Sequence, residues 1–194
     1  NKYFSAITSN SKFTNNKTLF VYDKNTNLKN IYLDEVLKNK TPAIISNKYI
    51  NNLNIPQFVV SNINFETYSL LNKLHNNLPF KTIAVTGTNG KTSVVWYISK
   101  ILNSLKYNNT TVGTLGHFIN GKKINDINLT TPAYEELFKY GSSNKKEKNI
   151  YIFEASSHAL EQNRLRNYPI NIAAITNISK DHLDYHKTFS NYKK

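Results

Sequence analysis

Residues 87–92 have the residue types and the spacing of a loop that binds phosphate groups. Gly87 and Gly90 bracket a tight turn, and Lys91 and Thr92 follow at the start of an apolar helical pattern. Glycines let backbone N–H groups curl around phosphate oxygens, and a helix N-terminus adds partial positive charge. The lysine of such a loop reaches the β- and γ-phosphates, and the hydroxyl of Thr92 is suited to hold Mg²⁺. The pattern therefore predicts a site for ATP or a close relative.

The loop departs from the general motif at one position. That motif has a glycine five residues before Gly90, where this chain has Val85, so the loop is shorter than in most nucleotide triphosphatases. The alternative is a strand–turn–helix in which the glycines only make the turn. An apolar, β-branched strand is predicted at 82–85, and a helix is predicted to about Leu105. This order of elements favours phosphate binding.

A carboxylate follows the apolar run at residues 150–153. Glu154 comes directly after this predicted strand, whose nearly continuous apolar character is typical of a strand covered on both faces. Ligands of open parallel sheets bind at the carboxyl ends of the strands, and Mg²⁺ prefers oxygen ligands. We therefore predict that Glu154 binds a metal ion. The alternative is a glutamate in a solvated turn.

The segment at residues 176–186 follows another predicted strand and is rich in groups that bind metals or transfer protons. Two aspartates and two histidines lie within six residues of one another. Histidine titrates near neutral pH, and carboxylates bind hard cations. An alternative is a helix N-terminus with Ser179 as the cap and Asp181 in the first turn. Both interpretations can hold together, because the cap leaves His182 free.

Two sets of predicted elements position these residues. Residues 1–79 contain short strands and two amphipathic helices and end in a polar linker at 76–79, whereas residues 80–194 carry the phosphate loop and further apolar strands. This order predicts an α/β protein with a small N-terminal α/β domain, 1–79, and a phosphate-loop domain with a mostly parallel sheet, 80–194. Strands are predicted at 18–22, 43–46, 57–60, 82–85, 110–114, 150–153 and 172–175, and further helices at 31–37, 65–75 and 134–140.

Composition limits the classes to which the protein can belong. The 194 residues suffice for one large or two small domains, and the chain has no cysteine for disulfides or thiolate metal sites. No apolar run approaches the ~20 residues of a membrane span, and no secretory signal is visible. We therefore expect a cytoplasmic protein without membrane insertion.

The formal net charge of +13 raises the question of nucleic-acid binding. The lysines are scattered along the chain, and arginine, which makes paired contacts with phosphates and bases, occurs only as Arg164 and Arg166. An enzyme with an anionic substrate uses positive charge equally well. We expect no nucleic-acid partner, although a non-catalytic, basic nucleotide- or RNA-binding module remains an alternative.

Four segments occur in an order that resembles the Mur ligase family of peptidoglycan synthesis. They are Gly-Thr-Asn-Gly-Lys-Thr at 87–92, Leu-Thr-Thr-Pro at 129–132, Glu-Ala-Ser-Ser-His-Ala-Leu at 154–160 and Thr-Asn-Ile-Ser-Lys-Asp-His-Leu-Asp-Tyr-His at 176–186. The resemblance is greatest to the MurE type, which adds the third stem-peptide residue to UDP-N-acetylmuramoyl-L-alanyl-D-glutamate. It covers most of the chain, most strongly from residue 81 onward.

The resemblance implies a role for each matching residue. ATP would be bound by Gly87, Thr88, Asn89, Gly90, Lys91, Thr92, Ser93 and Asn177. Mg²⁺ would be held by Thr92 and Glu154, with His182 supporting a second metal ion, and the catalytic residues would be Lys91, Glu154 and His182. The UDP-linked dipeptide would be bound by Ser11, Thr130, Thr131, Ser156, Gln162 and Arg164, with Ser11 at the uridine end. For the Thr-Thr-Pro segment the alternative is a helix start, with Thr131 as the cap and Pro132 in the first position.

The resemblance also implies an ATP-dependent amide ligase. ATP would phosphorylate the terminal carboxylate of the UDP-linked dipeptide, and the amine of an amino acid would then attack the acyl phosphate. Such chemistry depends on positioning and charge neutralisation and needs no nucleophilic serine or cysteine. The sequence does not decide between diaminopimelate and lysine as the amino acid, and a folylpolyglutamate-synthase-like ligase remains the nearest alternative. We expect a monomer.

The two ends of the sequence predict a piece of a longer protein. The chain begins with Asn1, contains no methionine and stops at Lys194 in the first turns of a predicted helix. The family's carbamylated lysine would lie just beyond this point, and its third domain, which selects the amino acid, would be absent. We therefore expect an incomplete central domain and a chain that is inactive by itself.

Overall fold

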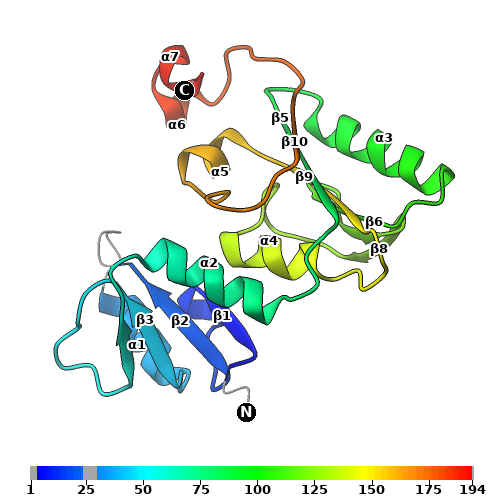
Figure 1. Ribbon diagram of the computed structural model, residues 1–194. Helices are drawn as coiled ribbons and strands as arrows, with labels where there is room; N and C mark the ends of the chain where they lie inside the picture. The colour runs from blue at the N-terminus through cyan, green and yellow to red at the C-terminus, as the bar shows by residue number, and fades with distance from the viewer. Residues whose placement is uncertain (1–3, 24–29, 194) are drawn as a thin grey trace. The chain divides into compact units, whose positions relative to one another are not determined.

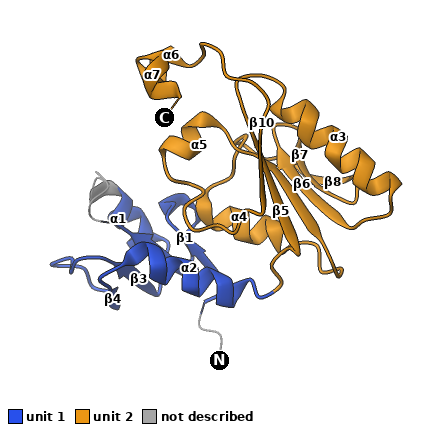
Figure 2. Ribbon diagram, turned by 45° about the horizontal axis from the view of Figure 1, so that its top comes forward, with its two compact units in different colours: residues 1–76 blue, residues 77–194 orange. Residues whose placement is uncertain are grey.

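The computed structural model describes residues 4–23 and 30–193, which form two compact units. Unit 1 comprises Asn1–Asn76 and unit 2 comprises Asn77–Lys194 (Figure 2). Asn77 lies in the predicted linker, yet its side-chain amide donates a hydrogen bond to the Asn144 carbonyl (3.1 Å) and ties it to unit 2. Within the described ranges no helix has both the length and the apolar character needed to cross a membrane.

Unit 1 contains a four-stranded parallel sheet (Figure 1). In spatial order its strands are β1 (Ala6–Thr8), β2 (Thr18–Tyr22), β3 (Ala43–Ser46) and β4 (Gln57–Val59). Its helices are the short 3-10 helix η1 (Ser11–Phe13), α1 (Asn30–Lys38) and α2 (Ile63–Leu74). The sequence predicts all of these except β1 and η1, which are too short to show a periodic pattern.

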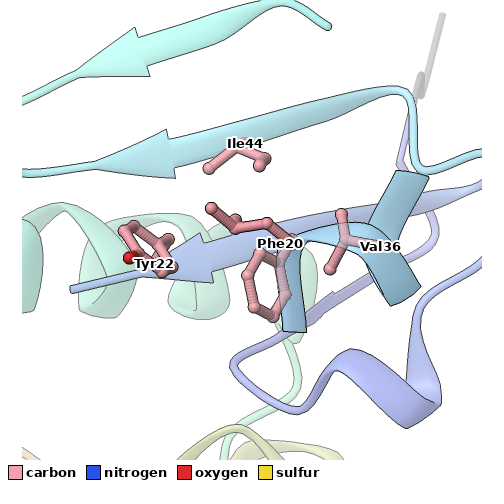
Figure 3. Close-up of a cluster of buried hydrophobic side chains, with 5 residues drawn as sticks. Phe20, Tyr22, Val36 and Ile44 are labelled. Atoms are coloured by element: carbon pink, nitrogen blue, oxygen red, sulfur yellow. The ribbon is translucent and has the colours of Figure 1, made fainter. Parts of the chain in front are cut away.

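The core of unit 1 forms where β2 and β3 pack with α1. Phe20, Tyr22 and Ile44 from the strands lie together with Leu33 and Val36 from the helix (Figure 3). All residues of β2 and β3 are buried. Continuous burial of this kind is typical of parallel strands that are covered on both faces.

Unit 2 is built on a six-stranded sheet that carries the phosphate loop. In spatial order its strands are β10 (Ile172–Ile175), β5 (Lys81–Thr86), β9 (Ile150–Glu154), β6 (Asn109–Gly113), β7 (Gly116–Ile119) and β8 (Lys122–Asn125). The first four strands are parallel to one another, as predicted. β7 pairs antiparallel with β6, and β8 pairs antiparallel with β7. Its helices are α3 (Lys91–Ser104), α4 (Tyr134–Gly141), α5 (Ser157–Glu161), α6 (Leu183–His186) and α7 (Phe189–Tyr192).

The hairpin of β7 and β8 is not among the predicted elements. Asn120 and Gly121 connect its strands, and both have positive φ values, 49° and 78°. An Asn-Gly pair between two short strands is typical of the type I′ turn, whose backbone twist matches that of a hairpin. This dipeptide is the signal in the sequence that identifies the hairpin.

The side chains of β9 alternate between the two covered faces of the sheet. Ile152 packs with Val85 of β5 and with Val95 of α3. Phe153 packs its ring against Tyr168, with the ring centroids 6.0 Å apart. Successive strand residues point to opposite faces, so Glu154 lies on the same face as Ile152. This alternation brings Glu154 to the side of the sheet on which α3 begins.

The apolar strand predicted at residues 172–175 differs from the strand at 150–153 because it is not covered on both faces. The segment does form β10, but β10 is the edge strand of the described sheet. Ile172 and Ile175 are 53% and 64% exposed. An apolar run indicates a strand, but it does not reveal where in the sheet the strand lies.

The alternatives that treat Ser179 and Thr131 as helix caps are also wrong. Helix α6 begins at Leu183, and its N-cap residue is His182. The N-cap residue of α4 is Ala133. The Thr131 hydroxyl instead bonds to the backbone of Glu154 and Ser156, and the Ser179 backbone N–H bonds to the Thr88 hydroxyl of the phosphate loop. Hydrogen-bond partners brought by the tertiary fold compete with local capping.

Candidate active site

The phosphate loop connects β5 to α3, as the sequence predicts. Gly90 is the N-cap residue of α3 and has left-handed backbone angles, φ 83° and ψ 0°, which glycine adopts without strain. The hydrogen bond from the Val94 N–H to the Gly90 carbonyl (2.9 Å) begins the helical ladder. The N–H groups ahead of Val94 therefore have no carbonyl partner within the helix. Together with the positive end of α3 they are suited to bind an anion.

Lys91 turns back over the loop that precedes it. Its Nζ donates hydrogen bonds to the carbonyl oxygens of Gly87 (2.6 Å) and Thr88 (3.0 Å). The ammonium group therefore lies against the backbone that would surround a phosphate group. Both partners are neutral, so the positive charge of Lys91 remains available to an anion.

The carboxylate of Glu154 lies beside the first turn of α3. Its Oε2 accepts a hydrogen bond from the Thr92 hydroxyl (2.8 Å), and its Oε1 accepts one from the backbone N–H of Thr114 (2.7 Å). The residue is only 1% exposed. A Cβ atom on Gly113 would come within 2.1 Å of Glu154 Oε1, so the carboxylate occupies space that only a glycine leaves open. The structure thus brings together Thr92 and Glu154, which lie 62 residues apart.

Three of the predicted substrate residues lie around the end of β9. The Thr131 hydroxyl donates to the Glu154 carbonyl (2.8 Å) and accepts from the Ser156 N–H (2.8 Å). Thr130 Oγ1 accepts a hydrogen bond from the Thr114 hydroxyl (3.2 Å). Ser156 also caps α5 by accepting a hydrogen bond from the Ala159 N–H (3.3 Å). These contacts connect the predicted substrate residues to the loop that carries Glu154.

Gln162 and Arg164 join the same group. Arg164 Nη1 donates to the Thr131 carbonyl (3.2 Å), and its Nε donates to Gln162 Oε1 (2.9 Å). The Gln162 amide in turn donates to the Tyr185 hydroxyl (3.0 Å). The guanidinium group is held in place by neutral oxygen atoms, so its charge is available to an anionic group of a substrate.

Asn177 contacts the phosphate loop directly. Its carbonyl oxygen accepts a hydrogen bond from the Thr88 N–H (2.9 Å), and its Oδ1 accepts one from the Asn89 N–H (3.1 Å). The Thr88 hydroxyl accepts a hydrogen bond from the Ser179 N–H (2.9 Å) and lies 2.8 Å from the Tyr192 hydroxyl. A cavity of ≈ 570 Å³ borders the loop at Gly87 and is lined in part by β10 and α7.

His182 lies in a cluster of aromatic rings. Its ring centroid is 4.9 Å from that of His158, which lies 4.1 Å from Tyr185 and 5.6 Å from His186. Burial, followed by the neighbouring imidazoles of His182 and His186, lowers the pKa of His158. In the part of the chain that the structure describes, no three His, Cys, Asp or Glu residues gather as metal ligands. A metal ion supported by His182 therefore stays a prediction.

Ser11 belongs to unit 1, whereas the other predicted site residues belong to unit 2. It is 4% exposed, and its hydroxyl donates a hydrogen bond to Glu35. The Asn39 amide donates to the Ser11 carbonyl (3.2 Å). The predicted role of Ser11 at the uridine end of a substrate stays a prediction.

Thr114 and Thr176 are two further polar residues of the site that are not among the predicted site residues. Thr114 follows β6 directly and binds both oxygens of Glu154, through its N–H (2.7 Å) and its hydroxyl (3.3 Å). Thr176 follows β10 directly, and its hydroxyl donates to the Asn89 carbonyl (2.6 Å). Both residues directly follow parallel strands, and ligands of such sheets bind at the carboxyl ends of the strands. This rule could have identified Thr114 and Thr176 as site residues from the sequence.

Comparison with known proteins shows similarity to the Mur ligase family. The family model described as the Mur ligase middle domain matches residues 85–194. Two curated relatives are UDP-N-acetylmuramoyl-L-alanyl-D-glutamate–2,6-diaminopimelate ligases. The relative from Helicobacter hepaticus is 38% identical over 154 residues, which is 77% of this chain and 33% of the relative. The relative from Rickettsia rickettsii is 38% identical over 194 residues, covering 96% of this chain and 40% of the relative.

A solved structure supports the same similarity over both units. The structure of a UDP-N-acetylmuramoyl-L-alanyl-D-glutamate–2,6-diaminopimelate ligase matches this chain with a TM-score of 0.75 and 28% sequence identity. The match covers 97% of this chain and 39% of the chain in that structure. The chain thus spans between a third and about two fifths of the length of these relatives.

Proposed function

The chain belongs to the Mur ligase family, and from this premise we propose that it is the nucleotide- and UDP-substrate-binding part of an ATP-dependent amide ligase. The proposed reaction adds an amino acid to UDP-N-acetylmuramoyl-L-alanyl-D-glutamate. The names of the relatives support 2,6-diaminopimelate as that amino acid. The observation that carries the proposal is the contact between Thr92 and the buried carboxylate of Glu154 at the end of the phosphate loop.

The residues around Glu154 fit a magnesium ion. The carboxylate is almost fully buried, and the partners described above are hydroxyl and N–H groups without charge. A buried carboxylate is costly unless a cation compensates its charge. Thr92 and Glu154 would supply the oxygen ligands that Mg²⁺ prefers. When bound, Mg²⁺ would neutralise negative charge on the ATP phosphates.

In the proposed reaction the protein acts by positioning its substrates. The N–H groups at the start of α3 and the ammonium group of Lys91 bind the phosphates of ATP. A carboxylate oxygen of the dipeptide attacks the γ-phosphorus, and ADP leaves. The amine of the amino acid then attacks the carbonyl carbon of this acyl phosphate, inorganic phosphate leaves, and an amide bond forms. Arg164 is suited to hold an anionic group of the dipeptide while this occurs.

We further propose that these 194 residues bind ATP and the UDP-linked dipeptide without completing ligation. The chain spans about two fifths of the length of its relatives, and the proposal assigns to these residues only the binding of ATP and of the UDP-linked dipeptide. An assay with ATP, the UDP-linked dipeptide and 2,6-diaminopimelate should show negligible tripeptide formation. Production of the tripeptide by this chain alone would contradict this part of the proposal.

Calorimetric titration tests the choice of substrate. The chain should bind ATP and UDP-N-acetylmuramoyl-L-alanyl-D-glutamate, and it should bind neither a folate nor RNA oligomers with comparable affinity. Tight folate binding would instead support a folylpolyglutamate-synthase-like ligase. Tight RNA binding with no binding of the UDP-linked dipeptide would support a non-catalytic basic module.

A further inference from the structure

Two side chains of the segment that follows β10 donate hydrogen bonds to the same carbonyl group of the phosphate loop. The Asn89 carbonyl oxygen accepts a hydrogen bond from the Thr176 hydroxyl (2.6 Å) and another from the Asn177 amide nitrogen (2.9 Å). Thr176 and Asn177 are neighbours at the end of the edge strand, and Asn89 lies at the middle of the loop. Two donors on one carbonyl oxygen fix the direction in which that carbonyl points.

This direction decides where the next N–H group points. Asn89 and Gly90 share one peptide unit, and in a trans peptide the carbonyl and the N–H point to opposite sides. Because the Asn89 carbonyl points toward Thr176, the Gly90 N–H points away from Thr176. The left-handed backbone of Gly90, with φ 83°, continues this arrangement into the first turn of α3.

The same segment also occupies the two N–H groups that precede Gly90. The Thr88 N–H bonds to the Asn177 carbonyl, and the Asn89 N–H bonds to the Asn177 side chain. The donors that remain for a phosphate group are therefore those from Gly90 onward, at the positive end of α3. A rotated Asn89–Gly90 peptide would replace the first of these donors with a carbonyl oxygen, which repels a phosphate.

The close approach of Thr176 depends on Gly87. A Cβ atom on Gly87 would lie 2.1 Å from Thr176 Oγ1 and 2.9 Å from the Asn177 carbonyl oxygen. Gly87 also has a φ of 132°, which side chains other than hydrogen rarely allow. The first glycine of the loop thus makes room for the β10 segment, in addition to making the turn.

We propose that Thr176 is a positioning residue of the phosphate loop, whose hydroxyl orients the Asn89–Gly90 peptide so that the Gly90 N–H is presented to a nucleotide phosphate. This inference rests on the proposed function, since it requires that the loop bind ATP. Thr176 itself contacts the loop backbone, so its effect reaches the nucleotide through the peptide that it holds.

Substitution of the hydroxyl alone tests this role. Thr176→Val keeps the shape of the side chain, and we expect the dissociation constant for ATP to rise about tenfold, which corresponds to one lost hydrogen bond in the loop. Binding of adenosine, which has no phosphate, should not change. Thr176→Ser keeps the hydroxyl and should stay within about twofold of the wild-type affinity for ATP.

Thr67→Val is a matched control in unit 1. Thr67 is buried in α2, and its hydroxyl has no hydrogen-bond partner within the described residues, so this substitution should leave ATP binding unchanged. If Thr176→Val does not fold, comparison of Thr176→Ser with Thr176→Ala isolates the hydroxyl in the same way.

The possible results separate this inference from the proposed function. If the wild-type chain binds ATP and the folded Thr176→Val variant binds it equally well, the role of Thr176 is refuted and the proposed function stands. Equal weakening of ATP and adenosine would also refute it, because that result indicates a packing role. If the wild-type chain does not bind ATP, the proposed function and this inference both fail.

Discussion

Lys91 and Arg164 are cationic side chains whose described contacts are to neutral oxygen atoms. Lys91 donates to two carbonyl oxygens of its own loop, and Arg164 donates to the Thr131 carbonyl and to Gln162. A positive charge held in place by neutral groups keeps most of its attraction for an anion. We therefore expect the two residues to bind different anions, the phosphates of ATP and an acidic group of the UDP-linked dipeptide.

Replacement of Lys91 by alanine should abolish measurable ATP binding and leave the fold intact. The lysine contributes the charge nearest the loop, whereas its contribution to stability is limited to two hydrogen bonds with carbonyl groups of that loop, about 1 kcal/mol each. Calorimetry with ATP and a urea unfolding curve measure the two effects. Lys100→Ala is the matched control, because Lys100 lies in the same helix with its Nζ 4.5 Å from the centroid of the Trp96 ring. ATP affinity like that of the wild type in folded Lys91→Ala protein would refute the phosphate-loop assignment.

Replacement of Arg164 by alanine should weaken binding of the UDP-linked dipeptide and hardly affect binding of ATP. A charge-assisted hydrogen bond contributes roughly 1.5–3 kcal/mol, so the dissociation constant for the dipeptide should rise about 10- to 100-fold. Arg166→Ala removes the same charge from the same segment and serves as the control, since Arg166 stacks on the Tyr134 ring at 4.8 Å. Equal losses for both ligands in Arg164→Ala would indicate that Arg164 has a packing role.

At the scale of elements, His117 joins the β7–β8 hairpin to the end of α4. Its Nδ1 lies 3.0 Å from Asn125 Oδ1, its Nε2 lies 3.1 Å from Ser143 Oγ, and its ring packs against Tyr140 with centroids 4.8 Å apart. Burial lowers the pKa of His117 below 6.5; the bond to Asn125 opposes this shift, and the charge of Lys139 adds to it. Burial therefore favours the neutral form of the imidazole.

Lowering the pH should reduce the stability that His117 contributes to the fold. Because the folded-state pKa is lower than the unfolded-state pKa of about 6.5, the unfolded chain binds the proton more readily. The stability that His117 contributes is complete above pH 6.5 and is lost as the pH falls below it. Urea unfolding at pH 8 and pH 5 should show that His117→Gln loses less stability between these values than the wild type does. At pH 8 the variant should be about 1–3 kcal/mol less stable, since buried partners are left unsatisfied. An unchanged pH dependence in the variant would show that His117 is not the titrating group.

At the scale of the whole molecule, charge and metal binding depend on the assembled site. The chain carries a net charge of +13, yet Glu154 is buried among uncharged donors in unit 2. Two protein oxygen ligands are few for Mg²⁺, which usually takes substrate phosphates and waters as its other ligands. We therefore expect the chain to bind Mg²⁺ weakly by itself and more tightly when ATP is present.

Replacement of Glu154 by glutamine tests this dependence. Mg²⁺ should strengthen ATP binding by the wild-type chain about tenfold and should have little effect on Glu154→Gln, because the amide lacks the negative charge. Calorimetric titration of ATP with and without Mg²⁺ measures both. Glu147→Gln, in an exposed loop, removes the same charge and should behave like the wild type. A full response to Mg²⁺ in Glu154→Gln would exclude Glu154 as a ligand.

The sequence by itself determined the features that depend on residues adjacent to one another in the chain. The glycines, Lys91 and Thr92 are contiguous, so their loop and the start of α3 follow from local backbone preferences. Glu154 was found because it ends an apolar run, which is also a local pattern. Most strands and helices of both units were predicted for the same reason, and the exceptions are short elements and the hairpin at the Asn120-Gly121 turn.

The tertiary structure decided which of these local features meet. β5 lies between β9 and β10, so the phosphate loop is contacted from one side by Glu154 and from the other by Thr176 and Asn177. Periodicity within a segment carries no information on strand order, because that order is set by packing between residues far apart in the chain. For this reason the edge position of β10 and the contact of Thr176 with the Asn89 carbonyl could be found only in the folded protein.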